Sequence, residues 1–261
     1  MNNVNKTLYI PLYGKALVSK KGIILSDKKA EEIWASEKFP LKGKSKSKWL
    51  AYYVGMRSAV FDKWTADKIN KNSNCLVLHL GCGLDSRFER VSVSHTRWYD
   101  VDFQSVIDER KKYYQETENY RMISADLKDS AFIEKLPTAT RAIIILEGVS
   151  MYLSNEELQQ LLATLNRKFE HLFVLVDCYT PLAAKMSKMR NPINDVGVST
   201  VFGVENPQIL EKSTGLYFVK EHEITPQYLI NDLQGFEKFI FKFLYAGSLA
   251  KKLYKLYEYE S

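Results

Sequence analysis

Short apolar segments alternate with amphipathic helical patterns through the middle of the chain. A continuous apolar run occupies residues 75–80 and ends at a glycine. Such a run is typical of a strand buried on both faces of a parallel sheet. Four further strand candidates follow, at residues 97–101, 120–124, 142–146 and 171–176. Because segments of helical length separate them, the pattern predicts βαβ units.

A long helix is predicted before the first strand. Apolar side chains there recur at spacings of four, three, four and four residues, which is one face of a helix: Trp49, Tyr53, Met56, Val60 and Trp64. Arg57 lies off this stripe. We therefore expect that the hydrophobic core does not require Arg57.

Two more helices are predicted between the strand candidates, at residues 103–116 and 155–169. Ser154 precedes the second one and is expected to cap its N-terminus. Glu156 and Glu157 lie in its first turn, where negative charge favours the helix dipole.

The pattern becomes irregular after residue 179. Residues 180–212 contain several prolines and glycines and form a long connection, and such segments are often lids. Strands are then predicted at 216–224 and 253–259. A helix is predicted at 233–244, with phenylalanine and isoleucine side chains on one side: Phe236, Phe239, Ile240 and Phe243.

The 261 residues are interpreted as a single α/β domain in four parts. An N-terminal helical segment spans residues 1–74, and a cofactor-binding core spans 75–179. A lid insertion spans 180–215, and C-terminal strands with a helix span 216–261. The candidate apolar residues for lining an acceptor pocket are Met186, Met189, Phe202 and Trp34.

Composition narrows the class of protein. Apolar residues make up 46 % and charged residues 26 %, which is the range of soluble globular proteins. The longest clean apolar stretch, residues 142–146, is far too short to span a bilayer. Three distant cysteines form neither a disulfide framework nor a metal-binding pattern: Cys75, Cys82 and Cys178. We expect a reduced, cytoplasmic protein without a metal and without a membrane partner.

The net charge of +6 is concentrated in one place. Five lysines between residues 38 and 48 account for much of it. We expect a solvated lysine-rich loop, and the alternative is an electrostatic funnel for an anionic substrate or nucleic acid. The run lacks interleaved aromatic residues for base stacking. No nucleic-acid partner is therefore expected.

The main chemical signal is the glycine turn of Gly81, Cys82 and Gly83, directly after the first predicted strand. Glycines there allow a tight turn and a close approach of the backbone to a ligand. A dinucleotide fingerprint would need a third glycine at position 86, which is Ser86. This argues against NAD or FAD. A ligand with ribose and adenine but no phosphate, such as S-adenosylmethionine, fits better.

Acidic residues follow three of the later strands. Asp100 and Asp102 lie 19 and 21 residues beyond Gly81, near the offset at which a carboxylate accepts ribose hydroxyls. Asp126 follows the third strand and could face adenine or cap a helix. Glu147 follows the fourth strand, where a parallel sheet places its ligand cleft.

Several of these segments together resemble the leucine carboxyl methyltransferase family, and most of all its branch of tetracenomycin-type polyketide O-methyltransferases. The similarity covers nearly the whole chain, through LYIPLYGKALVSK, SDKKAEEIW, AYYVGMRSAVFDKW, LGCGLDSRFERV, WYDVDFQSVIDER, LEGVSMYLSNEEL, VLVDCYTPLA and FGVENPQILEK. This resemblance implies a Rossmann-like class I methyltransferase fold with a mostly parallel seven-stranded sheet, helices on both faces, and S-adenosylmethionine as cofactor.

The resemblance also implies roles at the amino acid end of the cofactor. Arg57 would hold the methionine carboxylate, and Lys15 would assist it. Glu147 would meet the methionine amino group or its bound water. One cation and one anion suit the two ends of an amino acid.

At the nucleoside end, the resemblance implies that Gly81 and Gly83 let the backbone approach the cofactor. Asp102 would take the ribose hydroxyls, with Asp100 as its neighbour. Asp126 and Leu127 would face the adenine.

The reaction that these features predict is O-methylation of a carboxylate or a hydroxyl group on a small molecule. A carboxylate is already ionised at pH 7 and needs no general base, whereas an alcohol usually needs one. No convincing base stands out: His79 is expected to be structural, and His222 is a weak candidate for the cleft. No catalytic residue is assigned.

Other functions remain open or are disfavoured. A protein carboxyl methyltransferase and a non-catalytic nucleotide-binding module are the alternatives. A methyltransferase of exocyclic amines in nucleic acids would carry Asn or Asp, two prolines and an aromatic residue after the fourth strand. That place reads EGVS here.

Overall fold

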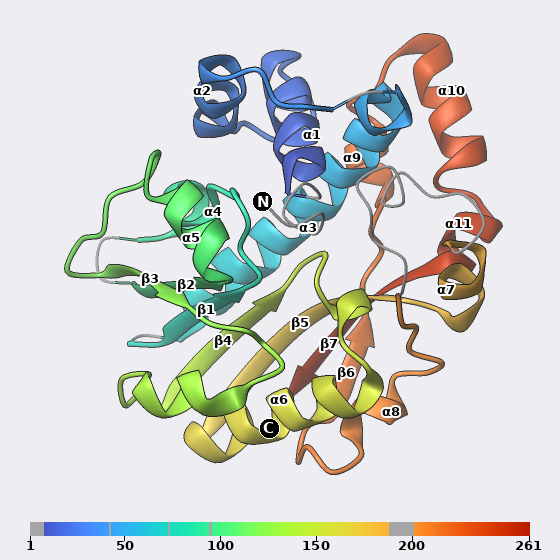
Figure 1. The fold of residues 1–261 in the computed structure, drawn as a ribbon. Helices are drawn as coiled ribbons and strands as arrows, with labels where there is room; N and C mark the ends of the chain where they lie inside the picture. The colour runs from blue at the N-terminus through green and yellow to red at the C-terminus, as the bar shows by residue number, and fades with distance from the viewer. Residues whose placement is uncertain (1–7, 42, 73, 94–95, 188–200) are drawn as a thin grey trace.

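Seven strands form one sheet with helices on both faces (Figure 1). The computed structural model describes residues 8–41, 43–72, 74–93, 96–187 and 201–261. The strand order is β3-β2-β1-β4-β5-β7-β6, with β1 to β5 parallel and β7 antiparallel to both of its neighbours. The predicted α/β fold with a mostly parallel seven-stranded sheet is confirmed.

The strands lie close to where the apolar pattern placed them. They span Leu76–Leu80 (β1), Arg97–Asp102 (β2), Tyr120–Ser124 (β3), Arg141–Leu146 (β4), His171–Tyr179 (β5), Tyr217–Glu221 (β6) and Tyr254–Glu260 (β7). β5 runs three residues beyond the predicted end because β7 pairs with it as far as Tyr179 and Tyr254.

The helices before the insertion are α1 (Tyr9–Lys20), α2 (Lys28–Ser36), α3 (Lys48–Lys71), α4 (Arg87–Val91), α5 (Gln104–Arg110) and α6 (Asn155–Lys168). Those after it are α7 (Pro181–Ser187), α8 (Gln208–Glu211), α9 (Gln227–Ile230), α10 (Gly235–Leu244) and α11 (Ser248–Leu253). Short 3-10 helices span Gly43–Lys46, Ser130–Lys135 and Ser150–Tyr152.

Alternate side chains of the central strands enter two hydrophobic cores. Val77 and Ile143 pack on one face of the sheet, with the N-terminal helices and α3. Leu78 and Ile144 pack on the other face, with the leucines of α6. This two-sided burial explains why β1 and β4 have no polar face in the sequence.

The cap predicted for α6 is present. The Ser154 hydroxyl accepts a hydrogen bond from the Glu157 backbone N–H at 3.1 Å, and the Glu157 carboxylate accepts one from the Ser154 N–H at 2.8 Å. This reciprocal pair is a capping box.

Two helix predictions need correction. The helix expected over residues 103–116 ends at Arg110, whose side chain is fully buried against Asp100 and Tyr120. α3 is buried on more sides than its apolar stripe, since Tyr52, Phe61 and Arg57 are also buried. The expectation that the core does not require Arg57 is therefore wrong.

The segment expected to be a lid begins with α7 and ends with α8. Its residues 188–200, which include Met189, lie outside the described residues. Its role as a lid stays a prediction.

The described lysines of the lysine-rich run are exposed: Lys38, Lys44, Lys46 and Lys48. All three cysteines are buried and free. None of the described helices has the length and apolar composition needed to cross a bilayer.

Candidate active site

A cavity of about 780 Å³ lies at the carboxyl ends of β1 to β5, the edge at which parallel α/β sheets place their ligands. Residues of α1 and α3 close it from the other side. It is lined by all but one of the sequence-predicted site residues, from different elements: Lys15, Arg57, Gly81, Gly83, Asp102, Asp126, Leu127 and Glu147.

The glycine turn forms the floor of the cavity next to β1. Gly81 has a φ of +68° and Gly83 a φ of +53°, values that side chains disfavour. A Cβ atom on Gly81 would also lie 2.2 Å from a methyl group of Val149. Both positions therefore favour glycine for conformation, and Gly81 requires it for space as well.

Asp102 ends β2 and faces the glycine turn. Its carboxylate accepts hydrogen bonds from the backbone N–H groups of Gly83 and Phe103, each at 2.8 Å. Burial raises the pKa of Asp102 to about 6. A carboxylate has about four acceptor positions, so Asp102 keeps acceptors for further donors in the cavity.

Asp100 does not line the cavity. It is fully buried and accepts hydrogen bonds from the Trp98 indole at 2.8 Å and the Tyr120 hydroxyl at 2.6 Å. It also pairs with the Arg110 guanidinium. Because strand residues alternate between faces, Asp100 and Asp102 share one face, but Asp100 lies one register step deeper in the sheet. Asp100 therefore belongs to a buried network of hydrogen bonds and an ion pair, and not to the lining of the cavity.

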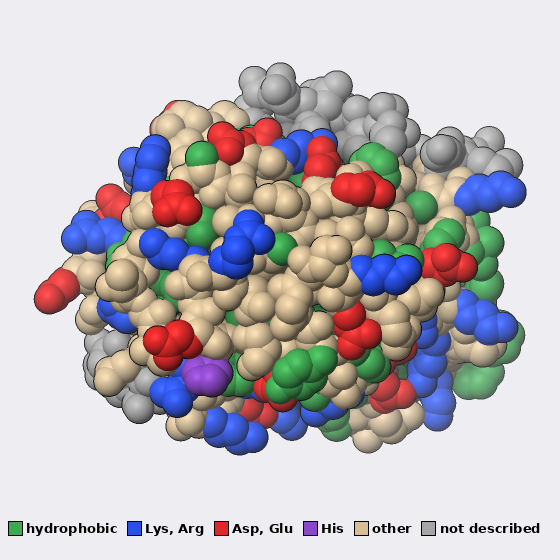
Figure 2. All heavy atoms as spheres, turned by 90° about the horizontal axis from the view of Figure 1, so that it is seen from below, with side chains coloured by type: hydrophobic (Ala, Val, Ile, Leu, Met, Phe, Trp, Pro, Cys, Tyr) green, Lys and Arg blue, Asp and Glu red, His purple; other side chains and the backbone are tan. Residues whose placement is uncertain are grey.

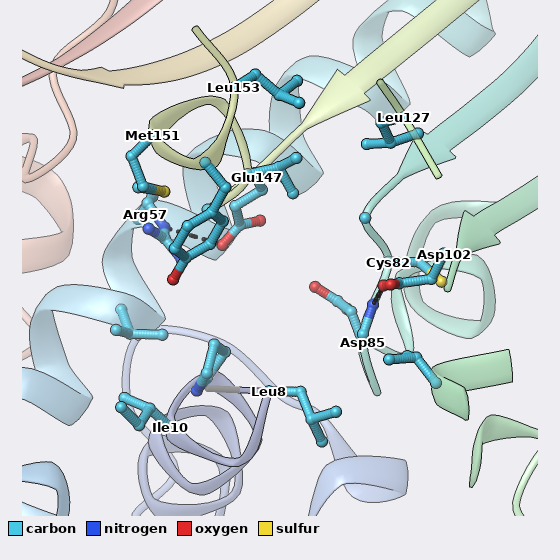
Figure 3. Close-up of a pocket in the computed structure, with 18 of the residues that line it drawn as sticks. Leu8, Ile10, Arg57, Cys82, Asp85, Asp102, Leu127, Glu147, Met151 and Leu153 are labelled. Atoms are coloured by element: carbon cyan, nitrogen blue, oxygen red, sulfur yellow. Dashed lines mark hydrogen bonds and ion pairs between the residues drawn. The ribbon is translucent and has the colours of Figure 1, made fainter. Parts of the chain in front are cut away.

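Arg57 and Glu147 meet at another side of the cavity (Figure 3). The Arg57 Nε donates to Glu147 Oε1 at 3.0 Å. Burial alone would raise the pKa of Glu147, but Arg87 and Arg57 hold it below its ordinary value. The site therefore presents an ionised carboxylate beside a permanent cation.

Asp177 and Tyr254 also contact the Arg57 guanidinium and fix its position. Arg57 Nη1 lies 3.0 Å from Asp177 Oδ2 and donates to the Tyr254 hydroxyl at 2.8 Å. Asp177 also accepts from the Gly148 N–H at 2.8 Å. Asp177 follows the apolar run of residues 172–176, much as Glu147 follows that of residues 142–146, so the same pattern in the sequence could have found it.

A second group of charges fills the base of the site. Lys15 Nζ pairs with Asp85 Oδ2 at 2.7 Å, and both side chains are buried. The Arg87 guanidinium is fully buried; it pairs with Glu147 and donates to Asp62 at 2.7 Å. Sequence reasoning gave no role to Asp85 or Arg87. Their place in the sequence could have indicated a role, because these two opposite charges come shortly after the glycine turn.

Asp126 and Leu127 follow β3 at the far side of the cavity. Asp126 is exposed, and one of its oxygens accepts from the Lys128 N–H at 3.0 Å, which is an Asx-type turn rather than a helix cap. Leu127 is buried, and Figure 3 shows it on the Asp102 side of the cavity, away from Arg57.

The rest of the cavity is mainly apolar. Its walls come from segments far apart in the chain: Leu8, Ile10, Pro11, Leu50, Tyr53, Val54, Met151, Tyr152, Tyr179, Ala183, Met186, Leu253 and Tyr254. Met186 was predicted to line a pocket and does so. Trp34 instead packs on Tyr13 and Phe39, and Phe202 is not among the lining residues.

Neither histidine considered above is placed to act as a base on an acceptor. His79 is buried within β1 beside Arg87, and burial lowers its pKa. His222 lies outside this cavity and bonds to Glu258 at 2.6 Å. His79 is the only histidine among the described residues that line the cavity.

Comparison with known proteins decides the family. The model of the family described as leucine carboxyl methyltransferase matches residues 3–166, more than half of the chain. The chain belongs to this family. It is an S-adenosylmethionine-dependent methyltransferase. The resemblance seen in the sequence is confirmed.

Two relatives are similar to this chain in sequence. The tetracenomycin polyketide synthesis O-methyltransferase TcmP of Streptomyces glaucescens is 27 % identical over 92 % of this chain and 90 % of its own length. An S-adenosyl-L-methionine-dependent methyltransferase of Gibberella zeae, dpfgK, is 25 % identical over 64 % of this chain and 61 % of its own length.

Solved structures support the fold of this methyltransferase. Magnesium protoporphyrin IX methyltransferase from Synechocystis PCC 6803 superimposes with a TM-score of 0.53, at 12 % identity, over 89 % of this chain and 93 % of that one. An S-adenosylmethionine-dependent methyltransferase from Mesorhizobium loti gives 0.51 at 13 % identity, over 77 % and 98 %.

Proposed function

We propose that this methyltransferase transfers a methyl group from S-adenosylmethionine to an acidic oxygen of a small apolar or aromatic molecule. The observation that carries the proposal is the division of one cavity into a charged part and an apolar part. The tetracenomycin O-methyltransferase, which acts in polyketide synthesis, matches along nearly the whole chain and supports an acceptor of this kind.

The charged part fits the cofactor. Arg57 and Glu147 offer one cation and one anion for the two charged groups of an amino acid. Arg57 Nη2 has no hydrogen bond recorded to any described residue, so it is free to donate to a carboxylate. Asp102 keeps acceptor positions for ribose hydroxyls. Leu127 offers an apolar surface for the adenine ring, and Asp126 a carboxylate for its amino group.

The apolar part fits the acceptor. Lys15, Arg57 and Lys128 are the only lysines and arginines that line the cavity among the described residues, and each already pairs with a carboxylate. The acceptor scaffold is therefore bound by burial of apolar surface. Four tyrosines among the lining residues give this part an aromatic wall: Tyr53, Tyr152, Tyr179 and Tyr254.

The described residues of the apolar part include no histidine, aspartate or glutamate that could act as a base, which restricts the reacting oxygen. Burial raises the pKa values of Tyr53 and Tyr254, so neither phenol accepts a proton from the acceptor. Glu147 and Asp177 are already paired with Arg57. The oxygen must then ionise in solution, as a carboxylate or a phenol acidified by neighbouring carbonyl groups does.

S-adenosylmethionine supplies an activated methyl group on a positively charged sulfur. An oxygen lone pair of the acceptor forms the new C–O bond while the C–S pair stays with sulfur, giving S-adenosylhomocysteine and a methyl ester or ether. The protein holds both molecules in line and excludes water. Arg57, Glu147 and Asp102 fix the cofactor, and the tyrosine wall orients the acceptor.

The test is a panel of acceptors with radiolabelled cofactor. Aromatic carboxylic acids, phenols flanked by carbonyl groups, simple alcohols and peptides with a free C-terminal carboxylate are compared. Mild base releases methanol from methyl esters but not from ethers, which separates the two products. We expect turnover of the first two classes. Turnover of the peptides alone would reject the small-molecule assignment, and cofactor binding without transfer to any class would reject the proposed activity.

A further inference from the structure

α10 turns an apolar face away from the protein. Phe236, Phe239 and Phe243 recur at spacings of three and four residues and are 75 %, 68 % and 74 % exposed. The opposite side of the helix packs inward through Phe241, which contacts the rings of Tyr52 and Tyr245. The helical face that the sequence predicted is therefore real, but its phenylalanines are outside the core.

The exposed apolar surface continues beyond these phenylalanines. Leu244 ends α10 and is 59 % exposed, and Leu249 of the following α11 is 61 % exposed. The two helices follow each other at one edge of the molecule (Figure 1). Single exposed apolar residues are ordinary, but a cluster of five on two consecutive helices marks an interaction surface.

The charges on the same two helices are mainly positive. Lys242 lies about a quarter of a turn around α10 from the phenylalanine stripe, Lys238 lies farther round on the same side, and Lys252 lies on α11. None of these three lysines forms an ion pair with a described residue. The one acid of the two helices, Glu237, already pairs with Lys48 at 2.7 Å.

We propose that α10 and α11 dock this protein on an anionic lipid surface. The three phenyl rings would enter the boundary between head groups and acyl chains, and the lysines would meet lipid phosphates. An apolar face with Phe and Leu beside a lysine-bearing flank is the composition of helices that lie in a membrane interface. The sequence led us to expect no membrane partner, and this surface contact differs from a membrane span.

A second copy of the chain fits the surface less well. A two-fold dimer joins the same patch of both copies. It would bring the lysines of α10 and α11 together, and these helices offer no unpaired acid to meet them. The face below the sheet carries acidic and basic side chains interspersed (Figure 2) and lacks this bias toward one sign.

The test is co-sedimentation of the full chain with vesicles of phosphatidylcholine alone or mixed with phosphatidylglycerol. We expect binding to the mixed vesicles that weakens at high salt. Replacing the phenylalanines together (Phe236→Ala, Phe239→Ala, Phe243→Ala) should weaken partitioning by roughly tenfold or more. Lys238→Glu with Lys242→Glu should remove the preference for anionic vesicles.

The controls use exposed residues elsewhere in the molecule. Tyr217→Ala with Val219→Ala on β6, and Lys71→Glu with Lys212→Glu, should bind vesicles like the wild type. The proposal is overturned if wild type does not bind, or if all variants bind equally. It is also overturned if wild type is a dimer that binds no vesicles and the phenylalanine variant is a monomer. Melting temperatures confirm folding, and the lysine pair tests the surface without removing apolar side chains.

Discussion

The two parts of the cavity are held in different ways. In the charged part, Arg57, Glu147 and Asp102 are each fixed by partners before any ligand arrives. In the apolar part, the side chains are fixed by packing. They come from α1 and the residue before it, and from α3, β5, α7, α11, β7 and the 3-10 helix after β4.

This difference separates binding of the cofactor from choice of the acceptor. The charged part is preorganised by ion pairs, so substitutions there disturb both stability and cofactor affinity. The apolar part contributes surface and shape, so substitutions there change which molecule is bound. The predictions below test this separation, from the largest expected effect to the smallest.

Arg57→Ala should have the largest effect. It leaves Asp177 buried without its cation, and losing one partner of a buried ion pair costs about 3–5 kcal/mol of unfolding free energy. Cofactor affinity should fall as well, because the carboxylate loses its guanidinium partner. Denaturant unfolding of the free protein and calorimetric titration with S-adenosylmethionine measure the two effects. Arg57→Lys should be intermediate in both.

The control is Arg167→Ala, an exposed arginine of α6, which should alter neither quantity. If Arg57→Ala were destabilised but bound the cofactor with wild-type affinity, Arg57 would be a structural residue only.

Asp102 and Asp100 should respond in opposite ways. Asp102→Ala should weaken cofactor binding by about 1–3 kcal/mol, because hydrogen bonds to an ionised carboxylate are lost. Asp100→Ala should mainly destabilise the fold, since it leaves the buried Arg110 unpaired. Titration at a temperature where both variants are folded separates the effects. A larger loss of affinity in Asp100→Ala would contradict the placement of the two residues.

The sequence predicted the cofactor part well for a physical reason. Gly81 and Glu147 directly follow β1 and β4, Asp102 ends β2, and the carboxyl ends of parallel strands meet at one edge. Asp100 was expected beside the cofactor, but the sequence does not show how deep in the sheet a residue lies. Two acids on one strand face differ in their distance from the edge, and only the contacts with Arg110 and Tyr120 show which one is buried.

The acceptor part could not be predicted in this way. Tyr53, Tyr179 and Tyr254 are distant in sequence, and nothing in their local pattern brings them together. Their meeting depends on β7 pairing antiparallel with β5 and on α3 crossing the sheet. The burial of Arg57 was missed for the same reason, because Asp177 and Tyr254 come from those two strands.

Cofactor affinity should depend on pH through Asp102. Its pKa is raised by burial to about 6 in the free protein, and ribose hydroxyls bind its ionised form. Affinity should therefore be full above pH 6 and fall as pH drops through 6, by up to roughly tenfold per pH unit. Calorimetric titrations with S-adenosylhomocysteine between pH 5 and pH 8 measure this change in affinity, because that range brackets the pKa of Asp102. The neutral Asp102→Asn variant should give a flat profile, and a flat wild-type profile would contradict the assignment.

The smallest effect is expected in the apolar part, and α7 offers a matched pair of residues. Met186 lines the cavity and is 47 % exposed, whereas Leu182 is 48 % exposed and does not line it. Met186→Ala should raise the KM for the acceptor by a factor corresponding to about 1 kcal/mol, because contact area with the acceptor is lost. Its cofactor affinity and unfolding free energy should stay at the wild-type values. Leu182→Ala should leave all three quantities unchanged. If both substitutions raised the KM equally, α7 would act on the acceptor through its position rather than through the side chain in the cavity, and the separation of the two parts would not extend to this helix.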